Sequence, residues 1–417
     1  MAATAMPGSD VPSLPADARG SRSRRLKELA ALFLKLGTVA FGGPAAHTAL
    51  MEDEVVRRRQ WLTRERFLDL LGATNLIPGP NSTELAIHVG YDRAGLPGLL
   101  VAGSCFILPA ALIVGAIAWA YVRFGRLPEV AGVLYGVKPV VIAVVAQALW
   151  RLGGTAVRTR GLAAVGAGAL LASLLGVDEL VVLFGAAALV AAAAPVARRR
   201  RAGELILPAV ALPDPGLTAG TPLAAGPATV AGVAGAGAAG AGVGLWPLFL
   251  VFLKIGSVLF GSGYVLLAFL RADLVERHHW LTEAQLLDAV AVGQVTPGPV
   301  FTTATFVGYL LAGPAGAAVA TVGIFLPAFA FVAASAPFVP RLRRSPTAGA
   351  FLDGLNVASL ALMAAVTLQL GRAALVDPTT VAVAAASAVL LLRYRVNATW
   401  LVAGGAVVGL AATWWGR

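Results

Sequence analysis

The sequence predicts an all-α integral membrane protein made of two inverted-topology repeats, each with re-entrant helical hairpins and about four full spans. Of the 417 residues, 58% are hydrophobic and only 13% are charged, whereas soluble proteins carry about 25% charged residues. Long Ala, Leu and Val runs without alternation favour helices over a β-barrel. The segment Lys35 to Pro80 recurs as Lys254 to Pro299, which indicates a duplicated domain.

The duplication is detailed enough to align the two halves residue by residue. At a constant separation of 219 residues, these pairs match: Lys35 with Lys254, Phe41-Gly42 with Phe260-Gly261, Trp61-Leu62-Thr63 with Trp280-Leu281-Thr282, and Pro78-Gly79-Pro80 with Pro297-Gly298-Pro299. A functional site is therefore expected between the two halves.

Composition divides the chain into four regions. Residues 1–27 are polar and basic and are expected to be disordered, and residues 28–197 form the first repeat. Residues 198–244 are a linker that begins with arginines and continues with prolines, and residues 245–417 form the second, inverted repeat. The Ala/Gly/Val run at 228–243 fits either a flexible linker or an extra, weakly hydrophobic span.

Apolar stretches that can cross a membrane, at roughly 20 residues each, follow each copy of the motif. Those of the first half are Gly95–Tyr121, Val130–Leu152, Leu162–Val177 and Leu180–Val196. Those of the second half are Pro314–Val339, Thr347–Leu370, Thr379–Leu392 and Val396–Trp415.

Equivalent loops of the two halves differ in their number of arginines: a loop that is rich in arginine in one half corresponds to a poorer loop in the other, and the richer half changes from one loop to the next. Residues 57–66 hold five arginines, whereas the counterpart 276–285 holds one; residues 123–126 hold two, whereas 341–344 hold three. Because basic loops stay in the cytoplasm, equivalent loops are expected on opposite faces of the membrane, as in an inverted repeat. For equivalent loops to lie on opposite faces, the chain between them must cross the membrane an odd number of times. This requirement favours the 228–243 run as a span.

The opening motif does not fit ordinary spans. Leu29–Phe41 measures roughly 20 Å at 1.5 Å per residue, too short for a core of ~30 Å, and it ends at the helix breaker Gly42-Gly43-Pro44. We therefore expect a re-entrant hairpin that returns through Ala45–Val56. A second hairpin is expected from Phe67–Leu76, the turn Pro78-Gly79-Pro80 and Ser82–Val89.

Helices that start after these turns offer unpaired N–H groups and the positive end of the helix dipole. Starts near Pro44, Pro80, Gly263 and Pro299 could therefore bind an anion near the centre. Small hydroxyl and amide side chains lie at the same turns. The predicted substrate site comprises Lys35, Gly42, Gly43, Pro44, Asn75, Pro78, Gly79, Pro80, Asn81, Ser82, Lys254, Gly261, Gly263, Gln294, Pro297, Gly298, Pro299 and Thr302.

Lys35 and Lys254 each interrupt an apolar helix at the same position of the repeat. A lysine within the membrane costs roughly 2.5–3.5 kcal/mol on insertion scales, which favours a functional role. The alternative is that each lysine extends to the membrane interface, because each lies near the start of its helix.

Several further ionisable residues stand in the first half. Glu84 and His88 lie four residues apart and share a helix face, so they could carry a coupling proton or form a plain hydrogen-bonded pair. His47 and the acidic run Glu52-Asp53-Glu54 are expected at the interface, paired with nearby arginines. A membrane-embedded enzyme that uses Glu84, His88 and His47 is a remote alternative.

Signatures of other classes do not occur in the sequence. It contains no His-Glu-x-x-His, Walker A or Gly-x-Ser-x-Gly motif and no Cys/His cluster, so we expect no enzyme, metal or cofactor. The basic clusters read as topology signals rather than as a nucleic-acid surface, and the bilayer is the expected partner. The oligomeric state, a homodimer included, is left open.

At these motifs the sequence resembles the chromate ion transporter (CHR) family in its two-domain long form. The matching segments are Phe41–His47, Trp61–Thr63, Asn75–Thr83, Leu134–Val140, Phe260–Tyr264, Trp280–Thr282 and Thr296–Pro299. The resemblance implies a multi-pass secondary transporter of the bacterial cytoplasmic membrane that exports chromate and confers resistance to it. Sulfate or another oxyanion or organic anion is the alternative cargo.

One departure between the two halves bears on the site. The second half has Gly261-Ser262-Gly263 where the first has Gly42-Gly43-Pro44. The two anion-facing turns are therefore not expected to be strictly equivalent.

Overall fold

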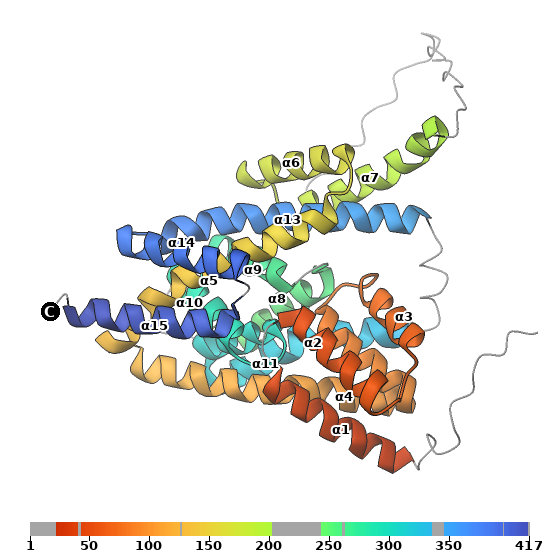
Figure 1. Ribbon diagram of the computed structural model, residues 1–417, viewed down its shortest axis with the longest axis horizontal. Helices are drawn as coiled ribbons and strands as arrows, with labels where there is room; N and C mark the ends of the chain where they lie inside the picture. The colour runs from red at the N-terminus through yellow and green to blue at the C-terminus, as the bar shows by residue number, and fades with distance from the viewer. Residues whose placement is uncertain are drawn as a thin grey trace, which may run out of the picture.

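The computed structural model describes residues 22–40, 43–125, 127–201, 243–260, 263–335, 346–394 and 396–415, and within these ranges all regular structure is helical (Figure 1). The first half contains α1 (Arg22–Val39), α2 (Gly43–Glu52), a π-helix (Asp53–Arg58), α3 (Arg64–Thr74), α4 (Asn81–Phe124), α5 (Pro128–Ala156), α6 (Arg160–Leu174) and α7 (Glu179–Arg201).

The second half repeats this order. It contains α8 (Leu245–Val258), a 3-10 turn (Gly263–Val265), α9 (Leu266–Leu270), a π-helix (Arg271–Arg277), α10 (Glu283–Val295), a 3-10 turn (Val300–Thr302), α11 (Thr303–Ser335), α13 (Pro346–Ala374), α14 (Pro378–Arg393) and α15 (Ala398–Trp415). The apolar stretches predicted to cross the membrane at 95–196 and 314–415 each overlap one of these helices.

Helix α4 consists of two helices folded back on each other. Ala94 and Gly95 have non-helical backbone angles, and Gly95 has φ +67°. A methyl group added at Gly90 would lie 2.3 Å from the carbonyl oxygen of Gly98, although eight residues of straight helix span about 12 Å. The short segment 81–93 therefore lies against the long segment 96–124, and α11 folds back in the same way at Ala312–Gly313.

Within the described residues, four helices are long and apolar enough to cross a membrane: α4, α5, α11 and α13. Helices α6, α7, α8, α14 and α15 are apolar but shorter. This pattern, together with large apolar side chains exposed along the spans, such as Leu112 and Trp119, establishes a multi-pass membrane protein.

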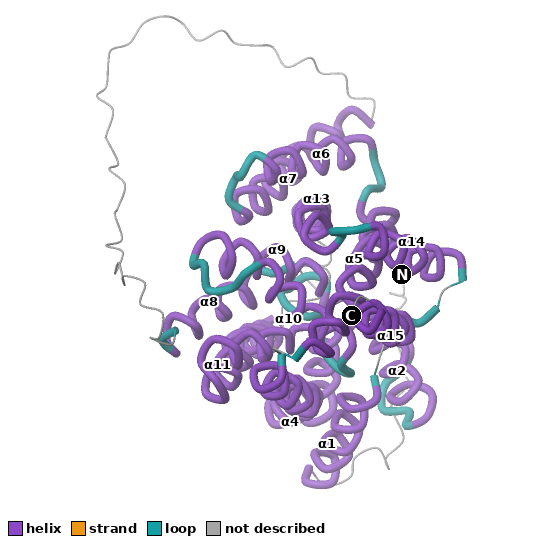
Figure 2. The backbone as a smooth tube through the Cα atoms, turned by 90° about the vertical axis from the view of Figure 1, so that its left-hand side faces the viewer, coloured by secondary structure: helices purple, strands orange, loops and turns teal. Residues whose placement is uncertain are grey.

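The two halves exchange their last helices. Helix α5 packs against α14 and α15 of the second half, and α13 packs against α6 and α7 of the first half. Helices α4 and α11 contact each other, as do α5 and α13 (Figure 2). Neither half therefore forms a separate packed body.

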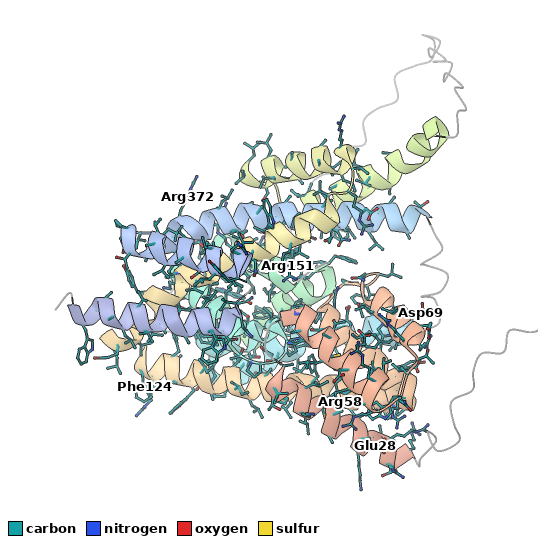
Figure 3. The ribbon with its side chains drawn as sticks, in the orientation of Figure 1. Glu28, Arg58, Asp69, Phe124, Arg151 and Arg372 are labelled. Atoms are coloured by element: carbon teal, nitrogen blue, oxygen red, sulfur yellow. The ribbon has the colours of Figure 1, made fainter. Side chains whose placement is uncertain are left out.

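Helices α5 and α13 run in opposite directions across the molecule. Along the horizontal axis of Figure 1, α5 runs from left to right and α13 from right to left. Figure 3 places Phe124, at the end of α4, and Arg372, near the end of α13, toward the same side. Arg58 and Asp69 lie toward the opposite side.

The contact between α5 and α15 depends on glycines that face each other. A methyl group added at Gly136 would lie 1.9 Å from the carbonyl oxygen of Gly405, and one at Gly409 would lie 2.0 Å from that of Gly132. Small residues four apart on both helices let the two backbones approach closely, the usual means of helix association in membranes.

The predicted boundary of the disordered N-terminus is wrong, because α1 already begins at Arg22. Glu28 stabilises this first part of the helix: it pairs with Arg24 one turn earlier at 3.1 Å and with Arg93 of α4 at 2.7 Å. The 228–243 run, apart from Val243, lies outside the described residues, so its predicted span stays a prediction.

Replacing Gly136 with Ala should destabilise the protein by about 1–3 kcal/mol, because the added methyl group forces the α5 and α15 backbones apart. Gly154→Ala is the matched control on the same helix, since a methyl group there meets no atom within 4 Å. The measurement is thermal unfolding in detergent. Equal midpoints for both variants would contradict a close contact between α5 and α15.

Candidate functional site

A cavity of ≈ 420 Å³ lies where the four predicted turns converge. The first half contributes Pro44 from the start of α2 and Pro80, Asn81 and Ser82 from the start of α4. The second half contributes Gly263, Val300 and Phe301 from the two equivalent turns. The remaining lining residues are Asn75, Leu152, Thr155, Ala156, Arg158, Val265, Asp353, Asn356, Ser359, Leu360 and Met363.

The polar wall of the cavity comes mainly from the first half. Asn81 Nδ2 donates a hydrogen bond to Asn75 Oδ1 at 2.9 Å, which ties the turn to the end of α3. The backbone amides of Asn81 and Ser82 occupy the first turn of α4, where N–H groups have no partner within the helix. Together these groups form a donor-rich wall that suits an anion.

Arg158 and Asp353 are the charged residues of the lining. Arg158 follows the end of α5, and its Nε donates to the carbonyl oxygen of Thr155 at 2.8 Å. No ion pair joins Arg158 to Asp353 or to any other acidic group of the described chain. Arg158 was not among the predicted site residues, because a loop arginine carries no local signal of a place beside the cavity.

His47 is buried, with 1% of its surface exposed, so the prediction that it lies at the interface beside arginines is wrong. Its Nε2 lies 3.0 Å from the carbonyl oxygen of Ala40, and its Nδ1 lies 3.2 Å from Ser82 Oγ. The ring also meets Phe106 edge-on, with ring centroids 5.6 Å apart. A polar ring that is satisfied on both nitrogens can be buried at little cost.

The Pro-Gly-Pro turns join the two halves reciprocally. The Gly79 amide donates to the carbonyl oxygen of Leu259 at 2.8 Å, and the Gly298 amide donates to that of Ala40 at 3.0 Å. Both glycines have positive φ, +140° and +90°, so a side chain there would be strained. The backbone amides of Gly79 and Gly298, both predicted site residues, are therefore already hydrogen-bonded within the protein.

The remaining predicted residues of the second half lie outside the cavity lining. Thr302 is buried and donates its hydroxyl proton to the carbonyl oxygen of Pro299 at 2.7 Å. Gln294 lines a neighbouring cavity of ≈ 610 Å³, together with Gly43 and Arg151. Pro78, Pro297 and Pro299 flank the inter-half hydrogen bonds described above.

The structure does not bring Lys35 and Lys254 to the cavity. Lys35 Nζ lies 2.8 Å from Glu54 Oε1, and Lys254 Nζ lies 2.7 Å from Asp273 Oδ1. The two ion pairs occupy equivalent positions, each joining the first helix of a half to its π-helix. The acidic run pairs with basic residues as predicted: Glu54 with Arg59, Asp53 with Arg58 and Glu52 with Arg64.

Glu84 and His88 are buried on the short segment of α4. Neither carboxylate oxygen of Glu84 has a hydrogen-bond partner in the described chain, and the same holds for His88 Nε2. The two side chains thus form no hydrogen-bonded pair. The Glu84 carboxyl group packs under the Pro-Gly-Pro turn, because a methyl group at Gly79 would lie 2.3 Å from Glu84 Oε1.

The first turn of the first half differs in structure from the first turn of the second half. The sequence predicts this difference, because Gly261-Ser262-Gly263 stands where the first half has Gly42-Gly43-Pro44. Gly43 has φ +76° and begins the regular helix α2, whereas Gly263 begins a 3-10 turn and a five-residue helix. The predicted site residues Gly42 and Gly261 lie outside the described residues.

Two like halves, wound around a central cavity and carried by apolar helices, are the architecture of a membrane transporter. The chain belongs to the chromate transporter family. The family described as "Chromate transporter" matches residues 27–192 and 246–410, one match in each half. No solved structure matches the chain.

Named relatives cover nearly the whole chain. A chromate transport protein of Cupriavidus metallidurans is 34% identical over 394 residues, 93% of each chain. A probable chromate transport protein of Synechococcus elongatus is 32% identical over 84% of this chain and 86% of its own. A chromate transport protein of Pseudomonas aeruginosa is 34% identical over 83% of this chain and 81% of its own.

The ion pair at Glu54 should be visible in the pH dependence of stability. The hydrogen bond from Lys35 is the largest cause that holds the pKa of Glu54 below its ordinary value, against burial. Because the folded-state pKa is lowered, the carboxylate stabilises the protein fully above the unfolded-state pKa of about 4.3, and this contribution disappears as the pH falls through the folded-state pKa.

Glu54→Gln should therefore cost up to about 1 kcal/mol at neutral pH, since Lys35 is half exposed and screened by solvent. The difference from wild type should shrink in acid, as followed by thermal unfolding across a pH series. Glu52→Gln, which loses only a contact of 3.7 Å to Arg64, is the control. A difference that grew in acid would contradict the assignment.

Proposed function

We propose that the protein is a secondary transporter that exports chromate across the cytoplasmic membrane and so confers chromate resistance. One observation carries this proposal: four turns of the duplicated motif line a single cavity in a chain that belongs to the chromate transporter family. The names of the relatives supply the chemical class of the cargo.

The chemistry of the cavity fits a tetrahedral divalent oxyanion. Such an ion accepts several hydrogen bonds at once, and the lining offers the amides of Asn81 and Ser82, the Asn356 side chain and the Arg158 guanidinium. A charge-assisted hydrogen bond from arginine is about twice as strong as a neutral one. Sulfate has the same charge and shape as chromate, so it is the natural competitor.

We propose an inverted topology for the two halves and re-entrant hairpins for the turn segments. The opposite directions of α5 and α13 (Figure 1) and the alternating basic loops support inversion. The short helices beside the turns pack against α4 in the first half (α1, α2 and α3) and against α11 in the second half (α8 and α10). This packing supports hairpins, because irregular backbone is tolerated at membrane depth only inside protein or beside a wet cavity. Movement of one half against the other would then alternate access to the cavity.

Proton coupling is part of the proposal. An ionised carboxylate without partners is costly to bury, so the isolated Glu84 side chain favours the protonated acid in this conformation. Its position under Gly79, whose amide bonds to the second half, would link gain or loss of that proton to contact between the halves. His88 lies one turn further along the same helix.

The proposal is tested by radiolabelled chromate flux in inverted vesicles, with sulfate as competitor and with an imposed pH gradient. Chromate should accumulate in vesicles that contain the protein, and expression in a sensitive host should raise chromate tolerance. A correctly inserted protein that changes neither accumulation nor tolerance would remove the chromate assignment.

Arg158→Gln should weaken chromate transport by about 10- to 100-fold at low substrate, because it removes a charge-assisted contact worth about 1.5–3 kcal/mol. Arg160→Gln, an exposed position two residues later that does not line the cavity, serves as the control. The measurement is the initial rate of chromate uptake against concentration. Equal losses in both variants would assign Arg158 to topology rather than to the anion.

A further inference from the structure

A buried hydrogen-bonded chain connects the cavity wall to the junction of the two halves. The Ala40 carbonyl oxygen accepts from the Gly298 amide at 3.0 Å and lies 3.0 Å from His47 Nε2. The other ring nitrogen, Nδ1, lies 3.2 Å from Ser82 Oγ. Ser82 lines the cavity and is 4% exposed, so its hydroxyl group stands between the imidazole and the space proposed for the anion.

The carbonyl group fixes the state of the ring. A carbonyl oxygen can only accept, so Nε2 must carry a proton to bond to Ala40. In the neutral imidazole Nδ1 is then an acceptor, and Ser82 must donate its proton to it. The hydroxyl group thereby presents oxygen lone pairs, rather than a proton, toward the cavity, which disfavours an anion there.

Protonation of the ring reverses this arrangement. In the imidazolium both nitrogens donate, so Nδ1–H donates to Ser82 Oγ and the serine proton is free to point into the cavity. The same event places one positive charge behind the cavity wall. Both changes favour an anion, because hydrogen bonds with a charged partner are the stronger kind.

We propose that His47 is the proton-binding residue that controls anion affinity, acting through Ser82, so that the cavity takes up one proton with each anion. This proposal rests on the proposed function: it assigns the proton bound together with the anion to His47, whereas the proton of Glu84 was proposed to act on the contact between the halves. It also makes Ser82 a donor only when the proton is present. By linkage, the proton raises anion affinity by the factor by which the anion raises proton affinity.

The hydrogen-bonded pair of His47 and Ser82 belongs to the first half, and the second half has no equivalent pair. The positions equivalent to His47 and Ser82 at the constant separation of 219 are Leu266 and Phe301, both buried and apolar. A single switch per chain predicts one proton, not two, for each anion bound.

Other titratable groups belong to the elements packed against α2, which are α1, the first π-helix and α4. In the described part of the chain the His47 ring hydrogen-bonds to Ala40 and Ser82. The titratable groups of these elements are Arg22, Arg24, Arg25, Lys27, Glu28 and Lys35 on α1, Asp53, Glu54, Arg57 and Arg58 on the π-helix, and Glu84, His88, Tyr91, Asp92, Arg93, Cys105, Tyr121 and Arg123 on α4, with Glu52 on α2 itself. Across the cavity, Arg158 and Asp353 face the same space as Ser82.

The experiment is calorimetric titration of purified full-length protein with chromate, above neutral pH, where chromate is a dianion. Repeating the titration in buffers of different ionisation enthalpy gives the number of protons taken up per anion. Wild type should take up protons when it binds chromate, and its affinity should fall as the pH rises, as a linked proton requires.

His47→Gln should bind chromate with no proton uptake and with a flat pH dependence, because glutamine can replace both hydrogen bonds but cannot titrate. Ser82→Ala keeps the ring but breaks the connection, so it should also lose proton uptake. His278→Gln, a change directly after the second π-helix and far from Ser82 in the chain, should keep the wild-type value.

The outcomes separate this proposal from the proposed function. Chromate binding by wild type without proton uptake would overturn the proposed role of His47 but would not contradict the proposed transport function. Uptake that survives in His47→Gln but disappears in Glu84→Gln or His88→Gln would overturn it in favour of those groups. Absence of chromate binding by wild type would overturn both.

Discussion

The structure depends on a constraint of the membrane: polar backbone away from water must find its partner within the protein. The two Pro-Gly-Pro turns interrupt helices in the interior, and each satisfies this constraint through the other half. Gly79 bonds to the carbonyl group at the end of α8, and Gly298 bonds to the carbonyl group at the end of α1. The positions of α1, α8 and both turns are thus fixed by one reciprocal pair of bonds, and the central cavity lies beside them.

Near-symmetry in the backbone coexists with asymmetry in the chemistry. The lysine ion pairs, the fold-back of α4 and α11 and the glycine turns all occur twice. The polar lining does not, because Asn81 and Ser82 stand opposite Val300 and Phe301. At these two helix starts the first half therefore contributes polar groups and the second half apolar surface, while Asp353, Asn356 and Ser359 of the second half line the cavity elsewhere.

Much of the fold could be predicted from the sequence, because hydrophobic length and helix breakers act locally. The spans, the break after the short helix at 82–89 and the convergence of four turns all followed from such patterns. The partners of individual side chains could not be predicted, because they depend on packing between distant segments. His47 has no local signal of burial, Arg158 looks like any loop arginine, and the carboxylates that pair with Lys35 and Lys254 lie 19 residues away from them.

The exchange of helices has a consequence for biosynthesis. Helix α5 obtains its neighbours α14 and α15 from residues that are translated long after it. Until α15 has been made, the glycine face of α5 that includes Gly132 and Gly136 cannot form this contact, and lipid must occupy it. The first half is therefore inserted before its packing is complete, and the arrival of α15 closes the contact with α5.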